Sequence, residues 1–235
     1  MQKYLKMLPP LIDIALFREA IEQDSLIITP NHRLAAKINE AWAFDCKHRS
    51  SVWRTPRVFA VDHWLKSCWD ELQDQNNVIV SGKAVVGAQQ SRYYWERAIN
   101  DNDPELSSKY AKMAGETLST LEQWDLTIDQ VPDDTNALTF LKRWTKTYRQ
   151  LLVRNNLITP IQSWQLIISA FEDGLLPNEP RPLTYGFQSK PPLIQKLLDT
   201  VSFDCEDIQS HKELNHRHVI LAVDYDEELR SAASW

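Results

Sequence analysis

The residues best suited to binding chemistry lie where a short apolar run, residues 26–28, gives way to a helical pattern. The first turn of a helix has free backbone N–H groups and the positive end of the helix dipole, which together bind anions such as phosphate. Asn31 is a residue type that begins helices, and basic side chains follow it. The residues expected to contact an anion at this turn are Asn31, His32, Arg33 and Lys37.

A basic excess continues beyond this turn. Residues 31–66 contain seven Lys or Arg against three acids, whereas the whole chain has a net charge of -6. Arg54 and Arg57 would add phosphate contacts, and Trp53 would stack on an unpaired base. The pattern predicts a local contact with single-stranded nucleic acid. The alternative, a capped and solvated helix beside a core tryptophan, is favoured by composition alone.

Other chemistries find little support. Gly82-Lys83 lacks the flanking glycine and hydroxyl residue of a phosphate-binding loop, and the chain has only 5 glycines. Serine-hydrolase and zinc-protease motifs are absent from the sequence. The loop 204–218 holds Asp, Glu, Cys and His, but their spacing matches no standard metal site, so a solvated loop is favoured. We therefore expect no catalytic residues, no cofactor and no bound metal.

Two strand–helix units frame the basic stretch. A helix is expected over 10–23, a strand over 26–28 and a helix from Asn31, and the unit recurs as a strand over 57–61 followed by a helix capped by Asp62. The apolar stripe of this last helix comprises Trp64, Leu65, Cys68, Trp69 and Leu72. Repeated strand–helix units indicate an α/β layer with a parallel sheet.

The middle of the chain, 81–175, has a different pattern. Successive helical periodicities cover about 83–100, 105–124, 135–155 and 161–173, with no strand pattern between them. Four tryptophans fall on apolar stripes of these helices: Trp95, Trp124, Trp144 and Trp164. The region is expected to be an all-helical inserted subdomain.

Strand signals return near residue 180. A strand is expected within 181–187, a proline-opened helix over 191–201, a strand over 218–223 and a last helix up to Trp235. The expected organisation is an α/β core from 1–80 and 176–235, interrupted by the 81–175 insertion. Because the last helix has barely begun at Trp235, we expect the chain to be part of a longer protein.

Several short motifs resemble a known family. The stretch TPNHRLAA (29–36), then VWRTPRVFAVDHWL (52–65), resembles the N-terminus of bacterial probable DNA repair proteins similar to the B subunit of the AddAB helicase–nuclease. The segments LTYGFQSKPPLIQKLLDTV (183–201) and VDYDEELRSAASW (223–235) agree in order. The resemblance implies a RecA-like, P-loop NTPase-like core of superfamily 1 helicase type, with a nuclease domain beyond Trp235. It also implies a single-stranded DNA contact at the positions that match helicase motif Ia: Thr29, Asn31, His32, Arg33, Ala35 and Ala36.

The sequence departs from active helicases at the ATP site. Residues 1–25 contain no glycine, so the ATP-binding loop is missing, and Thr184-Tyr185 stand where an active helicase has Asp-Glu. The resemblance therefore implies an inactivated, non-hydrolysing helicase domain of a DNA repair or recombination exonuclease. Its expected partners are single-stranded DNA and a partner helicase–nuclease subunit.

A second hypothesis involves no DNA contact. In it the acidic helical insertion docks a partner subunit and the chain is a protein-interaction module. Neither hypothesis involves a membrane, because the sequence has no run of about 18 apolar residues. The three cysteines form no CxxC motif, which fits a reducing cytoplasm.

Overall fold

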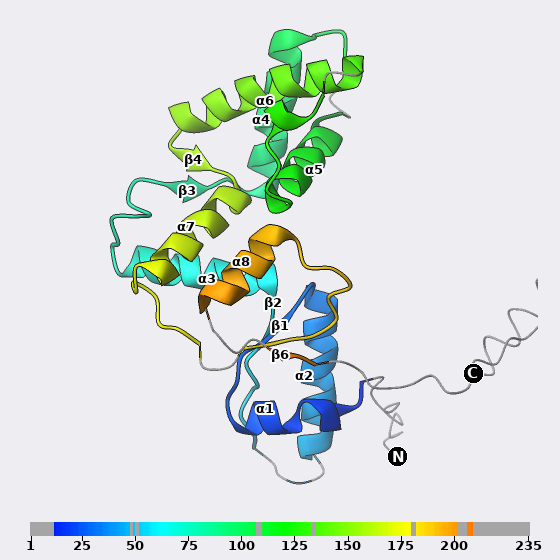
Figure 1. Ribbon diagram of the computed structural model, residues 1–235, viewed down its shortest axis with the longest axis vertical. Helices are drawn as coiled ribbons and strands as arrows, with labels where there is room; N and C mark the ends of the chain where they lie inside the picture. Colours follow the sequence, from blue (N-terminus) through cyan, green and yellow to red (C-terminus); the bar gives the residue numbers. More distant parts are fainter. Residues whose placement is uncertain are drawn as a thin grey trace, which may run out of the picture.

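A computed structural model describes residues 12–47, 49, 52–106, 110–132, 135–179, 182–201 and 206–208. Its elements fall into two regions along the long axis of the molecule (Figure 1). One region contains a parallel sheet with helices on both faces. The other is helical and continues from the first through a small two-stranded sheet.

The larger sheet is parallel throughout its described strands, as expected. Its order is β2-β1-β5-β6, with β1 (Ile27–Thr29) paired to β2 (Val58–Ala60) on one side and to β5 (Leu183–Thr184) on the other. The strand β6 (Glu206–Asp207) pairs with β5. All three residues of β1 are buried. The continuous apolar run before Thr29 therefore forms a central strand that is covered on both faces.

Alternate residues of the central strand enter different cores. Ile27 packs with Phe17 and Ile38 beneath η1 (Ile14–Leu16), α1 (Arg18–Glu22) and α2 (His32–Lys47). Leu26 and Ile28 enter a larger core on the opposite face. That core is built by α3 (Val61–Asp74), α7 (Pro160–Glu172) and α8 (Pro192–Val201). The result is a layered α/β arrangement, which confirms the predicted fold class at this level.

The helical region has its own core. It consists of α4 (Ala88–Asn102), α5 (Tyr110–Gln123), η2 (Ile128–Gln130) and α6 (Asn136–Arg154). Trp95 stacks on Tyr148 with ring centroids 4.2 Å apart, and Trp144 stacks on Phe140. The fourth predicted helix of the insertion, α7, packs instead into the core beside the sheet.

Three local expectations were wrong. The helix α3 begins at Val61 with Ala60 as its N-cap, so Asp62 lies in the first turn and does not cap the helix. The middle region does contain strands, since β3 (Ala84–Val85) and β4 (Leu157–Ile158) pair in parallel. Two-residue strands are too short to produce an alternating pattern. Trp124 lies beyond the end of α5 and is 44% exposed, because α5 stops at Gln123.

Parts of the expected C-terminal structure lie outside the described residues, namely the strand over 218–223 and the last helix. The same holds for the 204–218 loop apart from residues 206–208. Across the described helices, none combines the length and the apolar character needed to cross a bilayer.

Candidate functional site

The carboxyl edge of the parallel sheet is where the predicted anion-binding turn lies. The strands β1 and β2 both end there, and α2 and α3 both begin there (Figure 1). The strand β1 is flanked on one side by β2, which follows it, and on the other by β5, from much later in the chain. In open α/β sheets such a switch point is the usual place for a ligand.

The turn between β1 and α2 is held by two polar side chains. The Oγ1 of Thr29 is buried and lies 3.0 Å from the carbonyl oxygen of Asn31 and 3.2 Å from that of Phe59, to either of which it can donate. The Oδ1 of Asn31 accepts a hydrogen bond from the backbone N–H of Leu34 at 3.0 Å. Asn31 is thus the predicted N-cap, whereas Thr29 fixes the turn from inside the protein.

Exposed side chains follow this turn. His32 and Arg33 are both exposed, and no carboxylate partner of Arg33 occurs among the described residues. The Nε2 of His32 lies 3.2 Å from Oδ2 of Asp62, and its ring centroid is 5.6 Å from that of His63. Asp62 and His63 belong to the first turn of α3 and were not predicted as site residues. Their position directly after the neighbouring strand is the sequence signal that would have identified them.

The loop after β5 closes against this turn at a glycine. Gly186 has φ +82°, and a Cβ built on it would lie 2.3 Å from Cδ2 of Leu34. The loop and the first turn of α2 therefore touch, and a Cβ at this position would displace the end of the Leu34 side chain.

Replacing Gly186 with alanine is expected to lower the free energy of unfolding by about 2 kcal/mol, because a positive φ is strained for alanine and Leu34 must shift. Urea denaturation measures this change. The matched control is Gly87→Ala, since Gly87 has no atom within 4 Å of an added Cβ and no positive φ. Equal effects of the two substitutions would contradict the close packing at Gly186.

The predicted contacts from the second basic stretch lie at the other edge. Trp53, Arg54 and Arg57 precede β2, so they belong to the amino edge of the sheet. Arg54 pairs with Asp24 at 2.9 Å. Arg57 forms two hydrogen bonds to the carboxylate of Glu179, at 2.9 and 2.5 Å, and these raise the pKa of its guanidinium above the usual value. Both arginines are thus already engaged with acids.

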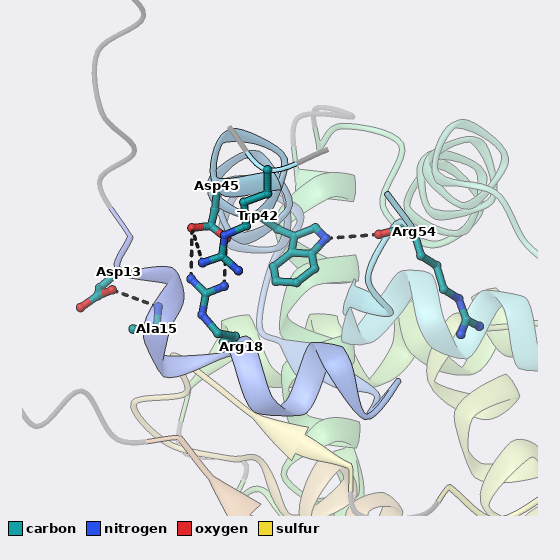
Figure 2. A network of polar contacts seen from close by, with 7 residues as sticks. Asp13, Ala15, Arg18, Trp42, Asp45 and Arg54 are labelled. Atoms are coloured by element: carbon teal, nitrogen blue, oxygen red, sulfur yellow. Dashed lines mark hydrogen bonds and ion pairs between the residues drawn. The ribbon is translucent and has the colours of Figure 1, made fainter. Parts of the chain in front are cut away.

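A polar network ties the amino edge to α1 and α2. Figure 2 shows Arg18 donating to both carboxylate oxygens of Asp45, each at 3.0 Å. It also shows Nε1 of Trp42 donating to the carbonyl oxygen of Arg54 at 3.2 Å. These contacts anchor α1 and the segment before β2 to the last turns of α2, which is a structural role.

Seven of the eight predicted contact residues therefore form two groups, one from Thr29 to Arg33 at the carboxyl edge and one from Trp53 to Arg57 at the amino edge. Trp42, which contacts the carbonyl oxygen of Arg54, follows Asn31 by a rise of about 16 Å along α2 at 1.5 Å per residue. The two groups therefore lie toward opposite ends of this helix. Lys37 lies between them and pairs with Glu40 at 2.6 Å. Of the predicted residues, His32 and Arg33 are the exposed cationic or titratable groups at the carboxyl edge.

Comparison with known proteins adds no family to this description. No protein-family model matches the chain, and no curated protein matches it.

Proposed function

We propose that this chain is a non-catalytic, helicase-like unit of a DNA repair or recombination exonuclease-type protein, and that it binds or guides single-stranded DNA. The observation that carries the proposal is the exposed start of α2 at the carboxyl edge of a parallel sheet, with His32 and Arg33 beside it. Backbone N–H groups and these side chains suit a phosphodiester oxygen. In this proposal the sheet is the remainder of a RecA-like core.

The end of β5 supports the non-hydrolysing part of the proposal. Thr184 is buried in the sheet, and Tyr185 packs edge-on against Phe17 with ring centroids 4.8 Å apart. These two residues stand where the resemblance implies an acidic pair that holds Mg²⁺. A tyrosine directed into the core beside α1 cannot supply that ligand.

The proposed binding is electrostatic and involves few contacts. We expect a labelled 20-residue thymidine strand to bind weakly and in a strongly salt-dependent manner, measured by fluorescence anisotropy. Each phosphate contact contributes about 0.7 to the slope of log K against log salt for single strands. Arg33→Glu is therefore expected to weaken binding about tenfold at about 50 mM salt and to lower the slope by about 0.7.

The control for this substitution is Lys112→Glu on α5, where the lysine is 78% exposed and the charge change is the same. It should leave the affinity within about twofold of the unchanged protein, because surface charges away from the strand contribute only screened interactions. An equal loss in both variants would indicate a general charge effect and would count against a contact at Arg33.

The interaction-module hypothesis has one specific observation in its favour. Trp124 and Leu126 are 44% and 47% exposed at the end of α5, and tryptophan is enriched at protein interfaces. If this hypothesis holds, Trp124→Ala will disrupt a complex with a partner helicase–nuclease subunit, measured by size-exclusion chromatography. Arg33→Glu will then leave the amount of this complex unchanged.

A further inference from the structure

The helix α6 has an unusual charge for this chain. It contains five basic residues and no acidic residue within Asn136–Arg154, in a protein of net charge -6. The basic residues are Lys142, Arg143, Lys146, Arg149 and Arg154. The helix lies in the region farthest from α1 and α2 (Figure 1). Its charge is therefore separate from the basic stretch near the sheet.

Four of these basic side chains line one groove. The groove has a volume of about 630 Å³ and lies between η2 and one side of α6. Lys142, Lys146 and Arg149 follow one another at helical spacing along it, over a rise of about 10 Å. A row of cations of this length suits a chain of anions better than a single small anion.

The two arginines in the groove are held in place by acidic residues outside α6. Arg143 pairs with Asp103 and lies 5.3 Å from the ring centroid of Phe140. Arg149 pairs with Glu122 of α5 at 3.0 Å. The side chains of Arg143 and Arg149 remain 45% and 39% exposed. They are thus oriented by the protein while their outer N–H groups still face solvent, which reduces the entropy lost on binding.

One further group has unused binding capacity. Lys146 is exposed and has no carboxylate partner among the described residues. Among the described residues that line the groove, Asp129 is the only acid.

We infer that the α6 groove binds phosphate groups of a single-stranded DNA backbone, as a contact surface separate from the carboxyl edge of the sheet. The lysines of the groove neutralise phosphates, and the two arginines, whose charges are already paired with acids, donate hydrogen bonds to phosphate oxygens through their outer N–H groups. The choice of DNA as the source of these phosphates rests on the proposed function. The net charge of residues 81–175 does not indicate a basic groove, because this region contains more acidic than basic residues in total.

The test uses the full chain and the labelled thymidine strand, with inorganic pyrophosphate as a competitor. The double variant Lys142→Glu/Lys146→Glu is expected to bind the strand about 50-fold more weakly at about 50 mM salt, with a slope lower by about 1.4. Lys112→Glu in the neighbouring helix is the control and should bind like the unchanged protein. Circular dichroism of each variant confirms that the fold is retained.

The outcomes separate this inference from the proposed function. If Arg33→Glu weakens strand binding and the α6 double variant does not, the groove is not a DNA contact and the inference fails alone. If the α6 double variant weakens binding and Arg33→Glu does not, the inference stands and the site at the carboxyl edge fails. If pyrophosphate binds through α6 but the strand does not, the groove is a site for small phosphates and the DNA assignment is wrong. If the unchanged protein binds neither, both proposals fail.

Discussion

Replacing Asp103 with alanine is expected to lower the free energy of unfolding by about 3 kcal/mol, because two donors lose a buried acceptor. Asp103 follows the end of α4 and is 6% exposed. One carboxylate oxygen accepts a hydrogen bond from Nε1 of Trp144 at 2.6 Å, and the other accepts from Arg143. Since both donors belong to α6, the residue joins α4 to the helix that carries the proposed groove.

Urea denaturation measures this loss, with Asp101→Ala as the matched control. Asp101 lies two residues earlier on α4, is 46% exposed and forms only a surface ion pair with Arg97 at 3.8 Å. Such pairs contribute less than about 1 kcal/mol. If the two substitutions have the same effect, the buried contact between Asp103 and Trp144 is not the stabilising interaction described above.

Arg57→Glu is expected to lower the free energy of unfolding by about 3 kcal/mol as well. The substitution removes both hydrogen bonds to Glu179 and places a second carboxylate against one that is only 14% exposed. The contact joins residues 122 positions apart in the chain, so its loss also loosens the segment before β5 from the amino edge of the sheet. Thermal or urea denaturation reports the change.

Arg54→Glu is the control for this prediction. Arg54 is 77% exposed and pairs with Asp24, so its reversal is expected to cost at most about 1 kcal/mol. A stable Arg57→Glu protein with reduced DNA affinity would contradict the structural role of Arg57. It would restore this residue as a DNA contact. With the expected loss of stability, a fall in binding by this variant would report unfolding, so Arg33 is the better probe.

Local patterns in the sequence predicted the elements around the carboxyl edge. The apolar run before Thr29 gave a central strand, Asn31 began α2 as its N-cap, and Pro192 opened α8. These features depend on neighbouring residues, for which propensity and hydrophobic periodicity carry the information.

Features set by distant residues were not predictable in the same way. The basic stretch near the sheet was expected to form one contact surface, but Arg57 meets Glu179 at the far edge and Lys37 meets Glu40. The sequence gives the charge of each residue without giving its partner. For α6, the total charge of the insertion was misleading in the opposite sense. The insertion is acidic overall, although this helix contains no acidic residue.

The proposal that single-stranded DNA lies across the carboxyl edge is tested most directly by photo-crosslinking. A thymidine strand containing 4-thiothymidine is bound to the full chain at low salt and irradiated, and the crosslinked peptides are mapped by mass spectrometry. We predict crosslinks within residues 31–37 and 62–66, around His32, Arg33 and His63, which disappear at high salt. Crosslinks confined to residues 52–57 at the amino edge, or none at any strand concentration, would contradict the account.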